Sequence, residues 1–122
     1  MVDTRSLVIK VTCGAEDAER CNQAFTVAAA AAVSGARVSL WLTGEASWFG
    51  VPGRAEAFSL PLAAPLADLL TTVIELGQVT VCTQCAERRS LKADDLREGV
   101  RIAGAAAFAE EILGAGVQAL VY

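Results

Sequence analysis

The sequence predicts an α/β fold in which helices cover a five-stranded, mainly parallel sheet of strand order 2-1-3-4-5. Short runs of β-forming residues alternate with helical segments along the whole chain. Glycines close the helical segments at Gly35, Gly77 and Gly114. The short connections favour strand–helix–strand units, which place successive strands parallel. The length of 122 residues predicts one domain over residues 1–122, and a hydrophobic content of 54% suffices for its core.

The first strand–helix–strand unit is expected at residues 6–11, 18–34 and 37–42. Asp17 is a suitable N-cap for the helix, whose sides are all apolar. Such a helix is buried within its own domain or against another subunit. Residues 43–61 predict a loop with a helical turn at 47–49, where Trp48, Phe49 and Phe58 cover a crevice or fill an interface. The helix that is apolar on all sides and the loop that carries these aromatic residues both predict a homo-oligomer.

The second half of the chain continues the alternation. A helix at residues 66–76 follows Pro65, whose missing N–H is tolerated in a first turn. Strands are predicted at 78–81, 100–102 and 117–121, a helical turn at 94–98 and a helix at 104–113.

Composition excludes several functions. The net charge is −4 and the 10 basic residues are scattered, so nucleic acid is not an expected partner. No apolar run is long enough to span a bilayer, and the N-terminus has no secretory signal pattern. Four cysteines then indicate reduced thiols in the cytoplasm. The chain has no histidine, which excludes histidine-based catalysis and histidine metal ligands.

The most informative stretch is VTVCTQCAERR at residues 79–89. A buried strand places Cys82 at its carboxyl end, where open α/β sheets bind ligands, and Cys85 follows at CxxC spacing. A thiol at the start of a helix is favoured as the reactive thiolate. Arg88 is near enough in sequence to hold an anionic substrate, whereas a solvated surface position is the stronger interpretation for Arg89.

Other residues are expected at the same edge of the sheet. In the order 2-1-3-4-5 the first and third strands are neighbours, so Cys13 joins Cys82 and Cys85 around one crevice, while Cys21 faces the core. Glu45, after the second strand, is a further crevice residue. Zinc requires four ligands, and one CxxC with Cys13 falls short. No metal and no cofactor are therefore predicted.

The ordered set of segments resembles the DsrE/DsrF/TusD family of small sulfur-handling proteins. The matching pieces are the Ala-rich first helix, WLTGE at 41–45, the stretch at 79–89, and LREGVRIAGA at 96–105. The resemblance implies a flavodoxin-like three-layer fold, a cytoplasmic location and oligomers of two, three or six subunits. It also implies a persulfide-bearing cysteine at Cys82. The extra Cys85 departs from relay members with one cysteine there.

Two functions remain open at this point. In the first, the protein traffics sulfur or performs thiol redox chemistry, with Cys82 as a persulfide carrier and Cys85 as its partner. It would then be a sulfurtransferase or sulfur carrier serving donor and acceptor proteins or small thiols. In the second, it is a non-catalytic oligomeric binding or scaffold subunit whose cysteines are structural.

Overall fold

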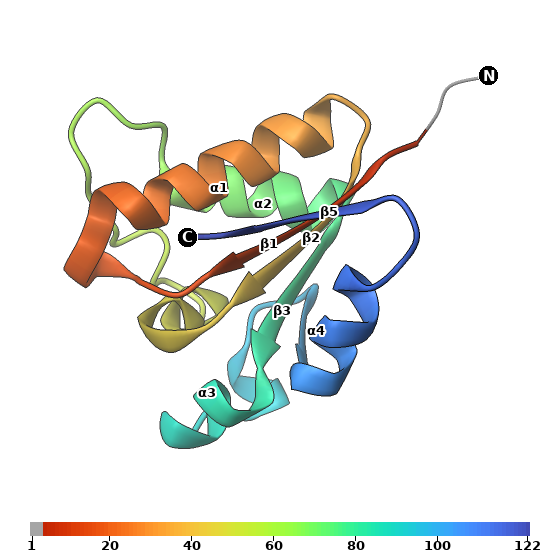
Figure 1. The fold of residues 1–122 in the computed structure, drawn as a ribbon. Coiled ribbons are helices and arrows are strands. Elements are labelled where there is room, and N and C mark those ends of the chain that lie inside the picture. Colours follow the sequence, from red (N-terminus) through yellow and green to blue (C-terminus); the bar gives the residue numbers. More distant parts are fainter. Residues whose placement is uncertain (1–3) are drawn as a thin grey trace.

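The computed structural model describes residues 4–122 and contains five strands in one sheet (Figure 1). The strands are β1 (Ser6–Val11), β2 (Arg37–Leu42), β3 (Gln78–Cys82), β4 (Val100–Ala103) and β5 (Val117–Val121). The helices are α1 (Ala18–Val33), α2 (Leu66–Leu76), α3 (Thr83–Arg88) and α4 (Ala105–Ile112). Short 3₁₀ segments at Ala15–Asp17, Gly44–Gly50 and Ala93–Asp95 complete the connections.

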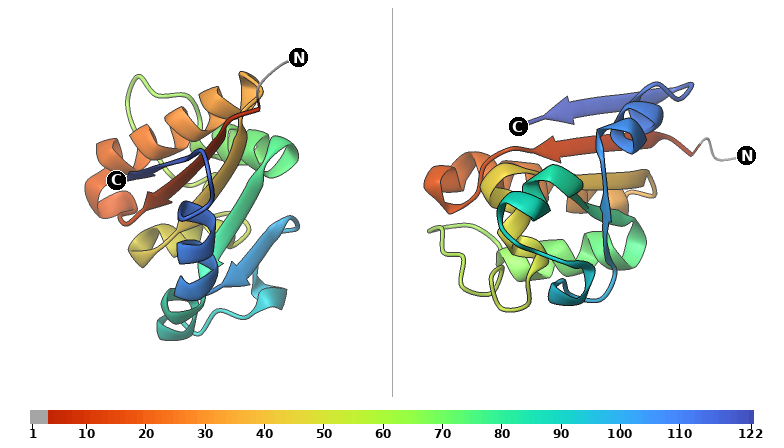
Figure 2. Two further views of the ribbon diagram at one scale, coloured as in Figure 1. Left: turned by 45° about the vertical axis from the view of Figure 1, so that its right-hand side comes forward. Right: turned by 90° about the horizontal axis from the view of Figure 1, so that it is seen from below.

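The predicted fold class is confirmed, since all neighbouring strands pair in parallel and helices flank the sheet (Figure 2). The strand order is β4-β3-β2-β1-β5, in which β2 lies between β1 and β3. The expected order 2-1-3-4-5 had β1 beside β3. In the structure each of the first three connections moves one strand along in the same direction, and only the last crosses back to the far side of β1. Right-handed crossovers are possible in both arrangements, so chain order alone does not distinguish them.

The hydrophobic core lies between the sheet and the helices α1 and α2. The largest fully buried side chains of this layer include Phe25, Ile9, Leu40, Leu42 and Leu70. Cys21 is fully buried, as expected. Asp17 occupies the N-cap of α1 without a side-chain capping bond and instead pairs with Arg20 at 3.4 Å.

Only one side of α1 is buried within the chain. Its buried residues are Cys21, Ala24, Phe25, Ala28, Ala29 and Ala32. Val33 at its end is 69% exposed. The apolar remainder of the helix therefore faces outward, and its burial against another subunit stays a prediction.

Within residues 4–122, α4 is the only helix that lies over the opposite face of the sheet (Figure 2). None of the α4 residues is buried. Phe108 packs edge-on against Trp41, with ring centroids 5.3 Å apart, and Trp41 itself is 1% exposed. The two faces of the sheet therefore differ: one packs against α1 and α2 to form the core, and the other is only partly covered by α4.

Candidate functional site

The CxxC pair lies where β3 ends and α3 begins. Cys82 is both the last residue of β3 and the N-cap of α3, and Cys85 is the third residue of the helix. These two helix positions are neighbours in space, because the N-cap and third helical residue face each other across the first turn. Cys82 is half-buried and Cys85 is buried. All four cysteines are free thiols. Within the described residues 4–122, only the Cys82 thiol is not buried.

The turn after β2 contacts Cys85. The Gly44 backbone N–H donates a hydrogen bond to the Cys85 Sγ at 3.3 Å. Gly44 has φ +55°, and a Cβ added there would lie 2.6 Å from the Thr12 carbonyl oxygen. This close approach requires glycine. A glycine with positive φ therefore presents its N–H to the buried thiol.

An ion pair joins the same turn to the end of α3. Arg89 donates to Glu45 Oε2 from Nε at 3.0 Å and from Nη2 at 2.9 Å. Arg89 also donates from Nη1 to the Cys85 carbonyl at 3.1 Å, and Trp48 Nε1 donates to Glu45 Oε2 at 3.2 Å. Glu45 thus holds together the turn that supplies the Gly44 N–H and the helix that contains Cys85.

Aromatic side chains line a hollow of about 270 Å³ beside Glu45. Phe49 packs edge-on between Phe25 of α1 and Phe58, at 5.9 and 5.6 Å between centroids. The Arg54 guanidinium lies over the Trp48 ring at 4.4 Å. These aromatics attach the long connection between β2 and α2 to α1, and Trp48 forms a wall of the hollow next to the thiol site.

Cys13 lies away from the CxxC pair. β2 separates β1 from β3, so the ends of β1 and β3 are two strand spacings apart, about 10 Å. The Cys13 Sγ is 3.8 Å from the Asp17 carbonyl oxygen. Burial raises the pKa of the Cys13 thiol, and the neighbouring Asp17 and Glu16 add to the increase. The expected cluster of three thiols around one crevice is therefore corrected to a pair, because β2 and not β1 is the neighbour of β3.

Cys21 is the least reactive thiol. Burial in the core raises the pKa of Cys21 to about 12, with Cys13 and Glu16 as further causes. Since the thiolate is the nucleophile, this raised pKa and the full burial of Cys21 disfavour its reaction at neutral pH. Between residues 4 and 122, no three Cys, Asp or Glu side chains gather as a metal site would require.

Comparison with known proteins identifies the family. A model of the DsrE/DsrF-like family matches residues 5–117. The chain belongs to this family. No curated protein sequence matches it.

Two solved structures share the DsrE-like fold with this chain at low sequence identity. The ychN protein from E. coli has a TM-score of 0.79 at 18% identity, covering 98% of this chain and 100% of its own. The protein of unknown function MTH1491 from Methanobacterium thermoautotrophicum has a TM-score of 0.62 at 10% identity, with the same coverage. At these identities the likeness concerns the fold alone. Across residues 4–122 of this DsrE-like chain, no helix has the length and apolarity to cross a membrane.

The position of the two arginines was not predictable from this DsrE-like sequence. Arg88 is exposed, and no ion pair or side-chain hydrogen bond joins it to another residue within 4–122. Arg89 instead makes the contacts to Glu45 and Cys85. Adjacent residues at the end of a helix point about 100° apart, so a single-residue difference decides which of them meets the loop. The sequence signals for Gly44 and Glu45 were their place directly after a predicted strand and their occurrence in the matching piece WLTGE at 41–45.

These contacts predict different results for two neighbouring substitutions. Arg89→Ala removes three hydrogen bonds that hold Cys85 against Gly44, so Cys85 should react faster with iodoacetamide in the native protein. Because Glu45 is 52% exposed, the loss of folding stability should be at most about 1 kcal/mol. Arg88→Ala is the matched control and should leave the Cys85 rate unchanged. Equal rates in the two variants, measured by peptide mapping, would contradict a positioning role for Arg89.

Proposed function

We propose that this DsrE-like protein carries sulfur as a persulfide on Cys82, with Cys85 as the thiol that accepts or releases it. The observation that supports this most directly is the difference in exposure among the four free thiols. Cys82 is half-buried at the carboxyl end of β3, whereas the others are buried. A sulfur donor can therefore reach Cys82 without unfolding the chain. The family is broadly associated with sulfur relay, which agrees with this chemistry.

The loading step is a thiol exchange. The Cys82 thiolate attacks the terminal sulfur of a donor persulfide, the donor S–S bond breaks, and the donor leaves as a thiolate. Cys82 then bears one additional sulfur. No oxidant is needed, because the sulfur transferred is already at the oxidation level of a persulfide.

Release can follow two routes. An acceptor thiolate can attack the terminal sulfur and take it, which regenerates the Cys82 thiolate. Alternatively, the Cys85 thiolate can attack the Cys82 Sγ, expelling hydrosulfide and forming a Cys82–Cys85 disulfide that an external thiol later reduces. The Gly44 N–H donates a hydrogen bond to the Cys85 Sγ at 3.3 Å and so holds this sulfur in place at the start of α3.

The proposal includes partners and a compartment. The donor and acceptor would be proteins or small thiols that reach the exposed side of Cys82, in a reducing cytoplasm. Leu120 and Val121 of the edge strand β5 are 40% and 65% exposed. Such apolar exposure favours a homo-oligomer, in which a second copy would cover this edge.

Native-state alkylation tests the proposal against a scaffold role. The folded protein is treated with a limiting amount of iodoacetamide, digested and mapped. We expect Cys82 to be modified at least about tenfold faster than Cys13 and Cys21, because only accessible thiolates react. Incubation with polysulfide before mapping should place the added sulfur on the Cys82 peptide. If Cys82 resists alkylation as strongly as Cys21, the cysteines are structural and the scaffold role is the better explanation.

A further inference from the structure

The face of the sheet covered by α4 is unusually polar. Side chains alternate along a strand, so one face of β1, β2 and β3 bears every second residue. On the α4 side these residues are Ser6, Val8 and Lys10 of β1, Arg37, Ser39 and Trp41 of β2, and Gln78, Thr80 and Cys82 of β3. A parallel sheet is normally buried on both faces and built from apolar strands. A second hydrophobic core on this face would require apolar strand residues, so its polar residues call for another explanation.

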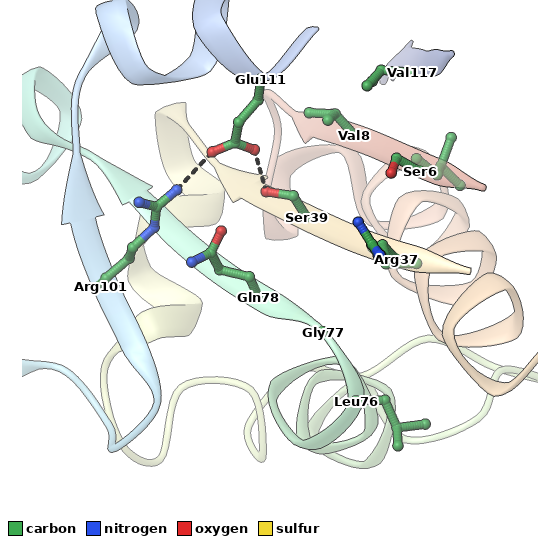
Figure 3. Close-up of a pocket in the computed structure, with 12 residues that line it drawn as sticks. Ser6, Val8, Arg37, Ser39, Leu76, Gly77, Gln78, Arg101, Glu111 and Val117 are labelled. Carbon is green, nitrogen blue, oxygen red and sulfur yellow. Dashed lines mark hydrogen bonds and ion pairs between the residues drawn. The ribbon is translucent and has the colours of Figure 1, made fainter. Parts of the chain in front are cut away.

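The helix α4 is too small to cover this face. Eight residues make a helix about 12 Å long, whereas five strands span about 19 Å across the sheet. The amino-terminal half of the face stays open and forms a cavity of about 420 Å³ (Figure 3). Its volume lies in the range typical of small-molecule sites. This cavity is at the end of the strands opposite to the CxxC pair.

One wall of the cavity is a hydrogen-bonded network centred on Glu111. Glu111 Oε1 accepts from Ser39 Oγ at 2.6 Å and from Trp41 Nε1 at 3.1 Å. Glu111 Oε2 accepts from Arg101 Nη2 at 2.7 Å, and Arg101 Nε donates to Thr80 Oγ1 at 2.7 Å. Both carboxylate oxygens are thus engaged, so Glu111 has little capacity left to bind a cation. The network fixes the position of this wall of the cavity.

The remaining lining offers donors and apolar surface. Arg37 and Gln78 line the open side of the cavity from β2 and β3, where both residues are exposed, and neither side chain has a hydrogen-bond or ion-pair partner among residues 4–122. With Arg101 balanced by Glu111, Arg37 gives the cavity a net positive charge. Val8 and Val117 supply apolar contacts (Figure 3). Unpartnered donors beside apolar side chains match a ligand with an anionic acceptor group and a short apolar body.

We propose that this cavity is a binding site for a small monocarboxylate with a short apolar body. Arg37 and the Gln78 amide donate hydrogen bonds to the ligand carboxylate, and Val8 and Val117 contact its apolar part. The planar guanidinium of Arg37 matches a carboxylate in a two-point contact. This site is separate from Cys82 and involves no covalent step.

The two tryptophans allow a direct test by NMR. Trp41 Nε1 reports on Glu111 at the cavity, and Trp48 Nε1 reports on Glu45 beside the thiol site. With 3-methylbutanoate as the probe, we expect a saturable shift of the Trp41 indole resonance and no shift of the Trp48 resonance. Isoamylamine, which has the same apolar skeleton but opposite charge, should shift neither.

Substitutions identify the contact that binds the probe. Arg37→Gln should weaken binding about tenfold, since it removes a charged hydrogen-bond donor. Lys92→Gln removes one positive charge from an exposed residue outside the cavity and should leave binding unchanged. Cys82→Ser should also bind normally, so this test is independent of the sulfur-carrier proposal. An unresponsive Trp41 resonance, or equal affinity in the Arg37→Gln protein, would overturn the proposed site.

Discussion

Cys82→Ser should abolish sulfur loading while leaving the fold intact. Serine lacks a nucleophilic sulfur, so no persulfide can form at that position. The fold should survive because Cys82 is the N-cap of α3 and makes no side-chain capping bond there. Serine is among the preferred N-cap residues, so the substitution should not lower stability. The measurement is intact-mass spectrometry after incubation with polysulfide, with circular dichroism to verify the fold.

Two further variants define the roles of the other cysteines. Cys85→Ser should retain loading on Cys82 but accumulate the persulfide, because no neighbouring thiolate can attack it. Cys13→Ala should behave like the wild type, since β2 separates the ends of β1 and β3. A sulfur adduct of unchanged size on the Cys82→Ser protein would exclude Cys82 as the carrier. A persulfide that decays equally fast with and without Cys85 would remove Cys85 from the release step.

Gly44→Ala should both lower stability and disturb the thiol site. The new Cβ would lie 2.6 Å from the Thr12 carbonyl oxygen, and this backbone atom cannot move aside as a flexible side chain could. Positive φ adds strain for any residue with a Cβ. We expect a stability loss of about 2 to 4 kcal/mol and a decrease in Tm of about 10 °C.

The displacement of the turn should also free Cys85. Since the Gly44 N–H would move away from the Cys85 Sγ, native-state alkylation of Cys85 should be faster. Gly53→Ala is the matched control, because Gly53 also has positive φ, +88°, but nothing lies within 4 Å of its added Cβ. The Gly53→Ala substitution should lower the free energy of unfolding by about 1 kcal/mol and leave the alkylation rate of Cys85 unchanged. Equal losses of folding stability in the Gly44→Ala and Gly53→Ala proteins would show that the clash with Thr12 has no effect of its own.

Much of the local structure was predictable from the chain itself. The bounds predicted for β1, β2, α2 and β5 match the structure, because periodicity and glycine positions act within a few residues. The single 3₁₀ segment at Gly44–Gly50 is longer than the turn predicted at 47–49. Its buried Ala46, Ser47 and Phe49 depend on packing against distant residues, which no local pattern encodes.

The sequence by itself determined the alternation of strands and helices, the family, and the place of Cys82 at a strand end with Cys85 three residues later. These features follow from local propensity and from residue types at fixed spacing. Only the tertiary structure decided that β2 separates Cys13 from the CxxC pair, and that Arg89 and not Arg88 joins Glu45. Similar apolar strands can pair in more than one order, and neighbouring helical residues differ only in direction. Contacts between residues far apart in the chain resolve both choices, and they likewise assemble the polar cavity beside α4.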